Sequence, residues 1–328
     1  MNLKNKKVLV TGAGGFIGSH LVEKLIENSA KVKAFVRYNS RNNWGWLETI
    51  KYKDDVEVYI GDIRDYDSVK NSLKGVEVVF HLAALIGIPY SYVSPLAYIK
   101  TNIEGTYNVL QSARELDIER VIHTSTSEVY GTARYIPIDE FHPLQPQSPY
   151  SATKISADNM ALSFYNAFDL PVTIVRPFNT YGPRQSARAV IPTIITQILT
   201  GKKQIKLGKL SPTRDLNFVK DTVNGFIKIA ECDELIGNVT NIGSGKEISI
   251  GSLADMIAKL MGVDIEIVQE KQRLRPNKSE VERLICNNAK IKKYTDWDPE
   301  YSLEDGLKET IKWIRANISL YKPEVYNV

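Results

Sequence analysis

The chain has 328 residues, of which 43% are hydrophobic and 24% charged, the composition of a globular protein long enough for about two domains. Its formal net charge of +4, from 42 basic and 38 acidic side chains, is too small to favour nucleic acid as a partner. The two cysteines, Cys232 and Cys286, lack metal-ligand spacing, so we expect reduced thiols and no metal site. The basic start and the glycines in the first apolar stretch argue against a signal peptide and a membrane span, and we expect a cytoplasmic protein.

Short runs rich in Val and Ile recur through residues 1–181 and alternate with stretches of helical spacing. Continuous apolar runs without polar alternation are typical of strands buried on both faces. Strands and helices in alternation predict a parallel sheet with right-handed crossovers, and therefore a doubly wound α/β fold. The predicted strands span residues 8–10, 32–36, 56–60, 76–82, 121–124 and 172–175.

The first predicted strand runs into a glycine-rich turn, Thr11-Gly12-Ala13-Gly14-Gly15-Phe16-Ile17-Gly18, which opens an amphipathic helix. Glycines let the backbone turn sharply and approach a diphosphate, whose charge then lies at a helix N-terminus. The position between the first strand and the first helix of a βαβ unit distinguishes a dinucleotide-binding turn from an ordinary one. In this Rossmann-type domain we expect the cofactor to contact Gly12, Gly15, Phe16, Ile17 and Gly18.

The end of the second predicted strand bears on which dinucleotide binds. NAD-binding proteins usually carry Asp or Glu about 20 residues further on, to hold the ribose 2′-hydroxyl. No carboxylate stands here, where the sequence is Arg37-Tyr38-Asn39-Ser40-Arg41. Two guanidiniums and a hydroxyl suit a 2′-phosphate. Arg37, Asn39, Ser40 and Arg41 therefore favour NADP, and NAD remains the alternative if these are solvated loop side chains.

Polar motifs follow the fifth predicted strand and open the next long helix. Residues 123–128 place hydroxyls and one carboxylate at the C-terminal end of a strand, where open α/β sheets bind ligands. Tyr150 and Lys154 are four residues apart and share one helical face, on which the lysine can lower the pKa of the phenol. A phenol prepared in this way can accept a proton from a hydroxyl group as hydride leaves.

After residue 181 the pattern loosens, and prolines separate shorter elements. Helices are predicted near residues 191–199, 252–261 and 303–314. We expect a dinucleotide-binding domain over residues 1–181, to which a segment near 217–244 returns. A smaller α/β substrate domain is expected over residues 182–328.

Taken together, the motifs resemble the extended short-chain dehydrogenase/reductase superfamily over nearly the whole chain. The resemblance implies an NAD(P)-dependent enzyme that acts on a nucleotide sugar, with Thr126 beside Tyr150 at the sugar 4-hydroxyl. It also implies that Asp62 and Ile63 lie along the adenine and that Leu82, Ala83 and Ala84 lie along the cofactor. The motifs are TGAGGFIG at 11–18, GDI at 61–63, HLAA at 81–84, STSEVYG at 125–131, YSATK at 150–154 and RPFNTYGPR at 176–184.

The residue at position 128, here Glu128, distinguishes the activities found within this superfamily. UDP-galactose 4-epimerases are similar overall but usually lack a carboxylate at this position. Thr126, Ser127 and Glu128 resemble the Thr, polar residue and Glu of nucleotide-sugar 4,6-dehydratases, although dTDP-glucose dehydratases have Asp in place of Ser127. The stretch 184–192 is similar to dehydratases of legionaminic-acid biosynthesis, which act on nucleotide-linked N-acetylglucosamine. The resemblance thus favours a 4,6-dehydratase acting on GDP- or UDP-N-acetylglucosamine.

A set of mostly basic residues is predicted to bind the substrate nucleotide and its diphosphate. Guanidinium forks match the geometry of phosphate oxygens. The segment 275–281 is similar to the nucleotide-contacting segment of GDP-mannose dehydratases, and 214–219 resembles the substrate-binding RDxxxV stretch of the superfamily. The predicted substrate-binding residues are Asn179, Arg188, Arg214, Arg275 and Glu280.

The implied reaction is a transient oxidation by a tightly bound cofactor that is regenerated in each turnover. Hydride leaves sugar C4 as Tyr150 takes the hydroxyl proton, and Glu128 then removes the C5 proton. Water leaves from C6 with Glu128 as acid, directly or through Ser127, and hydride returns to C6. A nucleotide-uronic acid decarboxylase, with Arg184 or Arg188 at the carboxylate, a 4-epimerase and a non-catalytic dinucleotide sensor remain open.

Assembly is the last expectation. The stretch 98–116 and the helix over 150–168 carry apolar side chains beyond one helical stripe. Related enzymes pair these two helices across a two-fold axis, which makes an isologous four-helix contact. We therefore expect a homodimer, or a larger assembly that contains it, and no membrane or nucleic-acid partner.

Overall fold

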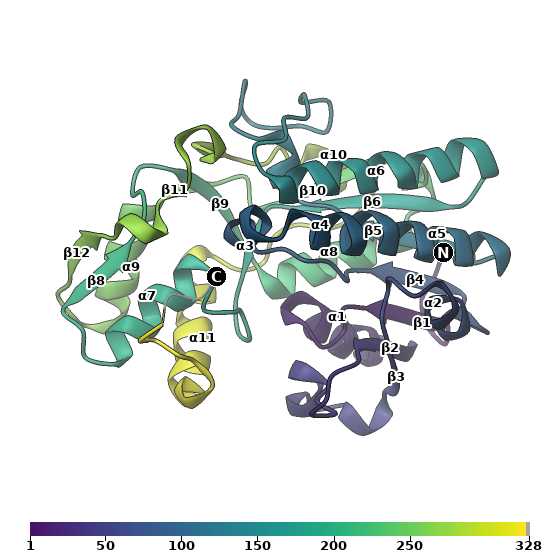
Figure 1. Ribbon diagram of the computed structural model, residues 1–328, viewed down its shortest axis with the longest axis horizontal. Coiled ribbons are helices and arrows are strands. Elements are labelled where there is room, and N and C mark those ends of the chain that lie inside the picture. The colour runs from purple at the N-terminus through teal and green to yellow at the C-terminus, as the bar shows by residue number, and fades with distance from the viewer. Residues whose placement is uncertain (326–328) are drawn as a thin grey trace.

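A computed structural model describes residues 1–325. Its larger layer is a seven-stranded parallel sheet with the order β10-β6-β5-β4-β1-β2-β3 (Figure 1). The order reverses between β1 and β4, where open α/β sheets bind ligands beyond the carboxyl ends of the strands. The doubly wound α/β fold expected from the sequence is confirmed. The strands are β1 (Lys7–Thr11), β2 (Lys31–Arg37), β3 (Glu57–Gly61), β4 (Val78–His81), β5 (Arg120–Thr124), β6 (Val172–Pro177) and β10 (Val239–Ile242).

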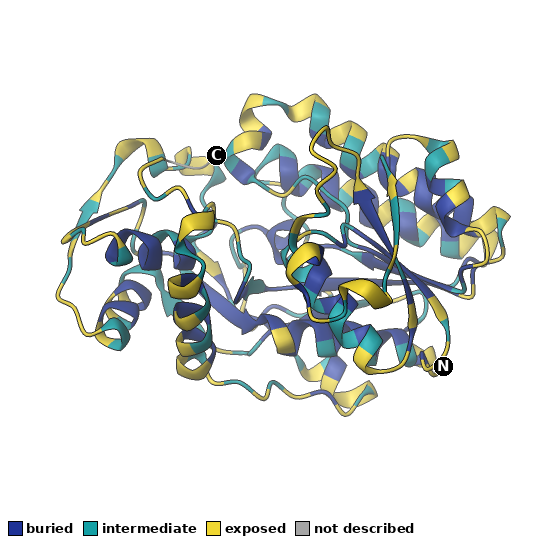
Figure 2. Ribbon diagram, turned by 90° about the horizontal axis from the view of Figure 1, so that it is seen from below, coloured by how far each residue is buried: buried dark blue, intermediate teal, exposed yellow. Residues whose placement is uncertain are grey.

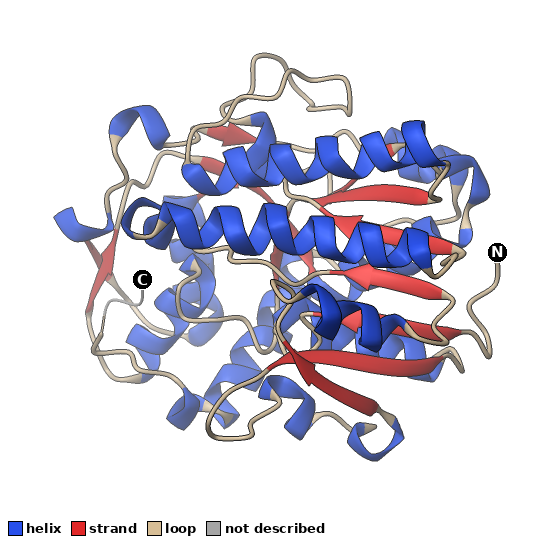
Figure 3. Ribbon diagram, turned by 45° about the vertical axis from the view of Figure 1, so that its right-hand side comes forward, coloured by secondary structure: helices blue, strands red, loops and turns tan. Residues whose placement is uncertain are grey.

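Helices cover both faces of this sheet, as Figure 3 shows. Val8 and Val10 pack into one apolar cluster and Leu9, between them, into another, which explains why the first strand has no polar alternation. One face carries α1 (Phe16–Glu27) and α8 (Val219–Glu231). The other carries α2 (Tyr66–Leu73), α5 (Gly105–Glu115) and α6 (Pro149–Phe168). Between β4 and α5 lie α3 (Ile88–Val93), α4 (Pro95–Tyr98) and the π-helical segment η3 (Ile99–Glu104).

A smaller unit of short strands and helices lies beside the large sheet, at the left of Figure 1. Its strand β9 pairs with β7, β11 and β13, while β8 pairs with β12. The three helices predicted in this half of the chain are present as α7, α9 and α11. The elements are β7 (Asn179–Tyr181), α7 (Val190–Leu199), β8 (Gln204–Leu207), β9 (Thr213–Phe218), β11 (Glu247–Ser249), α9 (Ile250–Met261), β12 (Glu266–Gln269), β13 (Arg283–Leu284) and α11 (Leu303–Ala316). Helix α10 (Ala289–Tyr294) lies beside the large sheet, where it packs against β10.

The chain crosses between the two units more than once. After β9, helix α8 packs against α1, and β10 then pairs with β6 at the edge of the large sheet. Figure 2 shows the buried strands between helices whose outer surfaces are exposed. Within residues 1–325, no helix has the length and apolar character needed to cross a membrane.

The start of α6 is fixed by local sequence. Ser148 is the N-cap: its side chain accepts a hydrogen bond from the backbone N–H of Ser151, whose hydroxyl oxygen accepts one from the backbone N–H of Ser148. Pro149 occupies the first helical position, where its missing N–H costs nothing. Tyr150 therefore lies in the first turn of a helix whose starting residue is well determined.

Candidate active site

A cleft of about 1050 Å³ lies along the carboxyl edge of the large sheet and extends to the smaller unit. Its walls come from the glycine turn, from the segments that follow β2, β3, β4 and β5, from the start of α6, and from residues 177–189. The predicted site residues that line it are Gly12, Gly15, Phe16, Ile17, Gly18, Arg37, Asn39, Asp62, Ile63, Leu82, Ala83, Ala84, Thr126, Ser127, Glu128, Tyr150, Lys154, Asn179, Arg188 and Arg275.

The glycine turn is held against the end of β4. The Thr11 hydroxyl accepts hydrogen bonds from the backbone N–H groups of Leu82 and Ala83, each at 3.1 Å. Gly12 has a φ of +69°, and a Cβ there would lie 2.9 Å from the Ala83 nitrogen, so a side chain is excluded by both strain and space. Gly15 is the N-cap of α1, so the first turn of this helix opens toward the cleft.

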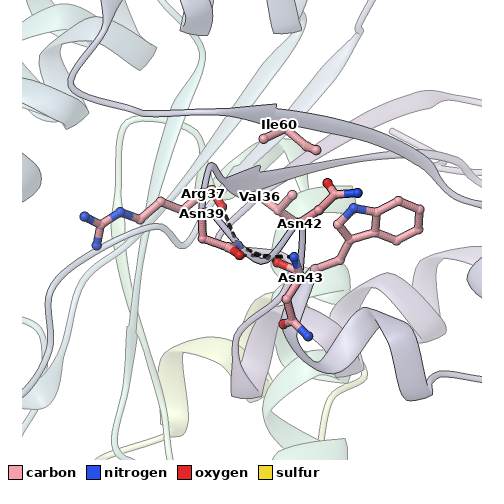
Figure 4. A pocket seen from close by; sticks show the side chains of 7 residues that line it. Val36, Arg37, Asn39, Asn42, Asn43 and Ile60 are labelled. Atoms are coloured by element: carbon pink, nitrogen blue, oxygen red, sulfur yellow. Dashed lines mark hydrogen bonds between the residues drawn. The ribbon is translucent and has the colours of Figure 1, made fainter.

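The segment after β2 forms a small pocket at one end of the cleft, where Val36 and Ile60 supply apolar walls (Figure 4). Arg37 is exposed and directed away from Asn42 and Ile60 (Figure 4). Across the described part of the chain, its guanidinium makes no hydrogen bond or ion pair. Asn39 holds the segment itself, since its carboxamide oxygen accepts hydrogen bonds from the backbone N–H groups of residues 41 and 43.

Two of the residues predicted to hold a 2′-phosphate do not reach the cleft. Ser40 and Arg41 are exposed and absent from its lining, because the turn organised by Asn39 directs them to solvent. Their contact with the cofactor stays a prediction. Asp62 does line the cleft, and its carboxylate accepts hydrogen bonds from Arg64 Nε at 2.9 Å and Nη2 at 2.5 Å. Hydrogen bonding to Arg64 lowers the pKa of Asp62.

The reacting end of the cleft brings together Thr126, Glu128 and Tyr150, all of which line it. Thr126 caps the 3₁₀ turn η4 (Ser127–Tyr130), because its hydroxyl oxygen accepts a hydrogen bond from the Glu128 backbone N–H. Burial raises the pKa of the Tyr150 phenol; a hydrogen bond with Thr126 opposes this shift, and the nearby Glu128 charge adds to it. Glu128 is itself 8% exposed.

Lys154, one turn after Tyr150 on α6, is buried beside the end of β5. Its ammonium donates a 2.6 Å hydrogen bond to the Thr124 carbonyl, and burial lowers its pKa to about 8, against the opposing effect of Asp158. The lysine is not among the main groups that shift the pKa of Tyr150, which burial raises. The two residues share one face of α6, as expected, and the lowering of the phenol pKa by Lys154 stays a prediction.

A network of buried ionic side chains lies next to Lys154, on the side away from the cleft. The sequence alone did not predict it. Asp158 Oδ2 accepts hydrogen bonds from the Ser125 hydroxyl at 2.7 Å and from Arg176 Nε and Nη2 at 3.1 and 2.9 Å. His123 Nε2 lies 3.3 Å from the other carboxylate oxygen, without hydrogen-bond geometry. Burial raises the pKa of Asp158, but His123 and Arg176 lower it overall. The signal was available: Asp158 follows Lys154 by four residues on the same helix.

The far end of the cleft carries polar atoms that have no hydrogen-bond partner within residues 1–325. These are Asn179 Oδ1, Gln185 Oε1 and Arg275 Nη1, all from cleft-lining residues. Burying a polar group without a hydrogen-bond partner costs free energy, so such atoms in a cleft indicate a surface that binds a polar ligand. Arg188 also lines this end and is exposed. Gln185, which the sequence analysis did not assign to the site, directly follows the RPFNTYGPR motif, and its amide gave no distinctive signal.

Four of the charged residues that the sequence assigned to the substrate take part in ion pairs. Glu280 Oε1 lies 3.3 Å from Arg214 Nη2 and 3.8 Å from Arg275 Nη1, so this carboxylate holds the two guanidiniums in place. Neither Glu280 nor Arg214 lines the cleft, and their direct contact with the nucleotide stays a prediction. Arg184 pairs with Glu23 of α1 at 2.7 Å.

A parallel doubly wound sheet, a glycine turn at its switch point and a Tyr-x-x-x-Lys helix beside a Thr-Ser-Glu turn define an extended short-chain dehydrogenase/reductase. Residues 9–310 match the family model described as GDP-mannose 4,6 dehydratase. The chain belongs to this GDP-mannose 4,6-dehydratase-like family.

The proteins that are similar to this chain are named for more than one activity. The chain is 33% identical to a putative UDP-glucose 4-epimerase of Methanocaldococcus jannaschii, over 94% of this chain and 99% of that protein. It is 30% identical to the dTDP-D-glucose 4,6-dehydratase of Homo sapiens, over 97% of this chain and 92% of that protein. DesIV, a dTDP-glucose 4,6-dehydratase of Streptomyces venezuelae solved with NAD bound, has a TM-score of 0.87 at 29% identity, over 97% of this chain and 99% of that one.

Proposed function

We propose that the protein is a nucleotide-sugar 4,6-dehydratase that uses tightly bound NAD(P) and acts on GDP- or UDP-linked N-acetylglucosamine. The observation that carries this proposal is the Glu128 carboxylate, which lines the cleft beside Thr126 and shifts the pKa of Tyr150. Elimination requires a second base next to the group that accepts the C4 hydroxyl proton, whereas oxidation at C4 alone does not. The resemblance of residues 184–192 to the dehydratases of legionaminic-acid biosynthesis supports the sugar.

The residues present fit a dinucleotide. No side chain can stand at Gly12 without overlapping the backbone at Ala83, and the first turn of α1 offers backbone N–H groups and its positive dipole end to a diphosphate. In this proposal Gly12, Gly15, Phe16, Ile17 and Gly18 hold the diphosphate, and Asp62 and Ile63 border the adenine. When bound, the nicotinamide supplies a hydride acceptor and later returns the hydride.

The chain's own residues then divide the proton transfers. Tyr150 accepts the C4 hydroxyl proton, with Thr126 holding the same hydroxyl, and Lys154 stabilises the phenolate through its charge. The resulting 4-ketone acidifies the C5 hydrogen, which Glu128 removes. Glu128 delivers that proton to the departing C6 hydroxyl, directly or through Ser127, so that water leaves and the carboxylate is regenerated. When hydride returns to C6, C5 takes up a proton, which balances the one that Tyr150 accepted from the C4 hydroxyl. Low exposure of Ser127 and Glu128 keeps competing water away from these steps.

NADP is the favoured form of the cofactor in this proposal. Arg37 is a free guanidinium at the end of β2, and no carboxylate follows it where NAD-binding proteins hold the ribose. Because Ser40 and Arg41 face solvent, Arg37 carries the 2′-phosphate interaction without them. NAD remains the alternative, supported by the NAD bound in the related DesIV structure.

A nucleotide-sugar 4-epimerase is the second candidate, favoured by the 33% identity to the M. jannaschii protein. A uronic acid decarboxylase would have to rely on Arg188, since Arg184 is paired with Glu23. Incubation with a panel of nucleotide sugars, followed by mass spectrometry, separates these activities. A dehydratase gives a product lighter by one water, and a decarboxylase gives one lighter by carbon dioxide. An epimerase gives a product of unchanged mass that chromatography separates from the substrate. A non-catalytic sensor gives no product by either method.

We also propose a cytoplasmic homodimer, formed through α5 and α6. Tyr107 on α5, Phe168 on α6 and Ile99 on the adjoining η3 are 42%, 44% and 47% exposed, more apolar surface than a free helical face needs. A two-fold contact through these helices would bury it. Light scattering at micromolar concentration should give at least twice the mass of the 37.0 kDa chain. A monomeric mass would contradict the proposed assembly.

A further inference from the structure

The segment that follows β2 is locked in place by its own side chains. Glu48 accepts hydrogen bonds from the Trp44 backbone N–H at 3.0 Å and from the Asn43 carboxamide at 2.9 Å. The Asn43 carboxamide oxygen in turn accepts a 2.8 Å hydrogen bond from the Gly45 backbone N–H. With the contacts that Asn39 makes, the segment has a defined course even though most of its residues are exposed.

This segment is seated directly on the glycine turn. The Trp46 backbone N–H donates a 3.0 Å hydrogen bond to the Gly14 carbonyl. A Cβ on Gly14 would overlap the Trp44 carbonyl oxygen, and a Cβ on Gly45, whose φ is +67°, would overlap the Gly14 oxygen. Gly14 lies outside the Gly12–Gly15–Gly18 spacing, and the close approach of Trp44 and Gly45 explains why this position has no side chain.

This contact places Trp44 in the wall of the cleft, with its side chain packed against the apolar core. Trp44 lines both the large cleft and the small pocket formed with Val36, Arg37 and Ile60, so it lies where these two spaces meet. Its Nε1 is buried and has no hydrogen-bond partner among residues 1–325. By contrast, the buried Trp297 Nε1 donates to the Asp221 carbonyl at 2.9 Å. A buried N–H without an acceptor is costly, and one that borders a cleft is available to a ligand.

We propose that the Trp44 indole N–H donates a hydrogen bond to an oxygen of the ADP moiety of the bound dinucleotide, on the ribose or its adjoining phosphate. This inference rests on the proposed function. The location between the glycine turn and the pocket at the end of β2 assigns the contact to the adenosine half of the cofactor and not to its nicotinamide. Gly14 and Gly45 contribute by fixing the approach of the indole to the diphosphate.

Calorimetry tests this proposal by measuring the affinity of the chain, freed of bound nucleotide, for ADP and for the whole dinucleotide. Trp44→Phe keeps an aromatic ring but removes the donor, and should weaken both ligands by about tenfold, the usual effect of a hydrogen bond to a charged group. Trp46→Phe is the matched control, because Trp46 lies on the same segment and packs edge-on against Trp313 at 5.3 Å. It should leave both affinities unchanged.

A second measurement does not require the Trp44 variant to fold. In the native chain labelled with ¹⁵N at its indoles, ADP should move one of the four tryptophan N–H resonances downfield and slow its exchange with solvent. Nicotinamide mononucleotide should not do so. Unchanged ADP affinity in Trp44→Phe, or four unmoved indole resonances at saturating ADP, would overturn this inference while leaving dinucleotide binding intact. Failure of the native chain to bind either ADP or the dinucleotide would overturn the proposed function with it.

Discussion

The two ends of the cleft are built in different ways. At the reacting end, Tyr150 and Lys154 stand on α6, whose first residue is set by Ser148, and a buried ionic network lies beneath them. At the adenosine end, Arg37 and Trp44 belong to an exposed segment that is shaped by hydrogen bonds between its own side chains and backbone. In the proposed function, Tyr150 and Lys154 thus lie on a regular helix that fixes their distances, whereas the residues that would select the nucleotide lie on a loop that can change with few substitutions.

Removing the phenol at the reacting end should have the largest effect and leave the adenosine end intact. Tyr150→Phe lacks the group that takes the C4 hydroxyl proton, and cofactor reduction in a single turnover should slow by about 10²–10⁴-fold. Dinucleotide affinity, measured by calorimetry, should stay close to the native value. Tyr165→Phe, on the same helix, is the control and should react normally. Equal cofactor reduction in the two variants would show that another group accepts the proton.

The sequence predicted the reacting end because its residues have fixed spacing on predictable elements. The four-residue interval from Tyr150 to Lys154 places both on one helical face, and Thr126 and Glu128 follow the end of a buried strand. The sheet order and the glycine turn follow from the same local patterns. What spacing could not supply is the effect of burial, which raises the pKa of Tyr150 and lowers that of Lys154.

Loop residues were predicted less well because their directions depend on contacts that are distant in sequence. Ser40 and Arg41 carry suitable chemistry, but the turn held by Asn39 directs them to solvent. Glu280 was assigned to the nucleotide, yet it lies beside Arg214, 66 residues away in the chain. Trp44 gave no signal in the sequence, since only the contact between Gly14 and Gly45 brings it to the cleft.

Breaking the network under the reacting end should alter both stability and pH dependence. Asp158→Asn leaves the buried Arg176 without its charge partner, which should lower the free energy of unfolding by about 3–5 kcal/mol. Because Asp158 raises the pKa of Lys154, which lies at about 8, its loss should lower that pKa further. The charged lysine is then lost at lower pH, so the alkaline decline of cofactor reduction should move down in pH.

Chemical denaturation and a pH profile of single-turnover cofactor reduction check the two effects separately. Asp169→Asn is the control, because Asp169 lies on the exposed C-terminal end of the same helix in a left-handed conformation that Asn tolerates. An unfolding free energy lowered without any movement of the pH profile would mean that Asp158 supports the fold but does not hold the charge of Lys154.

At the adenosine end a smaller and more selective effect is expected. Arg37→Asp removes a charge-assisted hydrogen bond worth about 1.5–3 kcal/mol and introduces repulsion, so NADP should bind at least tenfold more weakly while NAD binds better. Arg41→Asp makes the same change of charge at an exposed position outside the cleft and should change neither affinity. The comparison of the two cofactors is made by calorimetry. Equal affinity of the native chain for NADP and NAD would contradict the preference assigned to Arg37.

The most direct test of the proposed dehydration is a single turnover of Glu128→Gln with the nucleotide sugar that the native chain dehydrates. Glutamine keeps the shape and a hydrogen-bonding group but cannot remove the C5 proton, so elimination should slow by about 10²–10⁴-fold while C4 oxidation survives. Reduced cofactor should accumulate, visible by its absorbance, together with a 4-keto sugar that still bears its C6 hydroxyl. Native rates of water loss in this variant, or failure before any cofactor is reduced, would contradict the role assigned to Glu128.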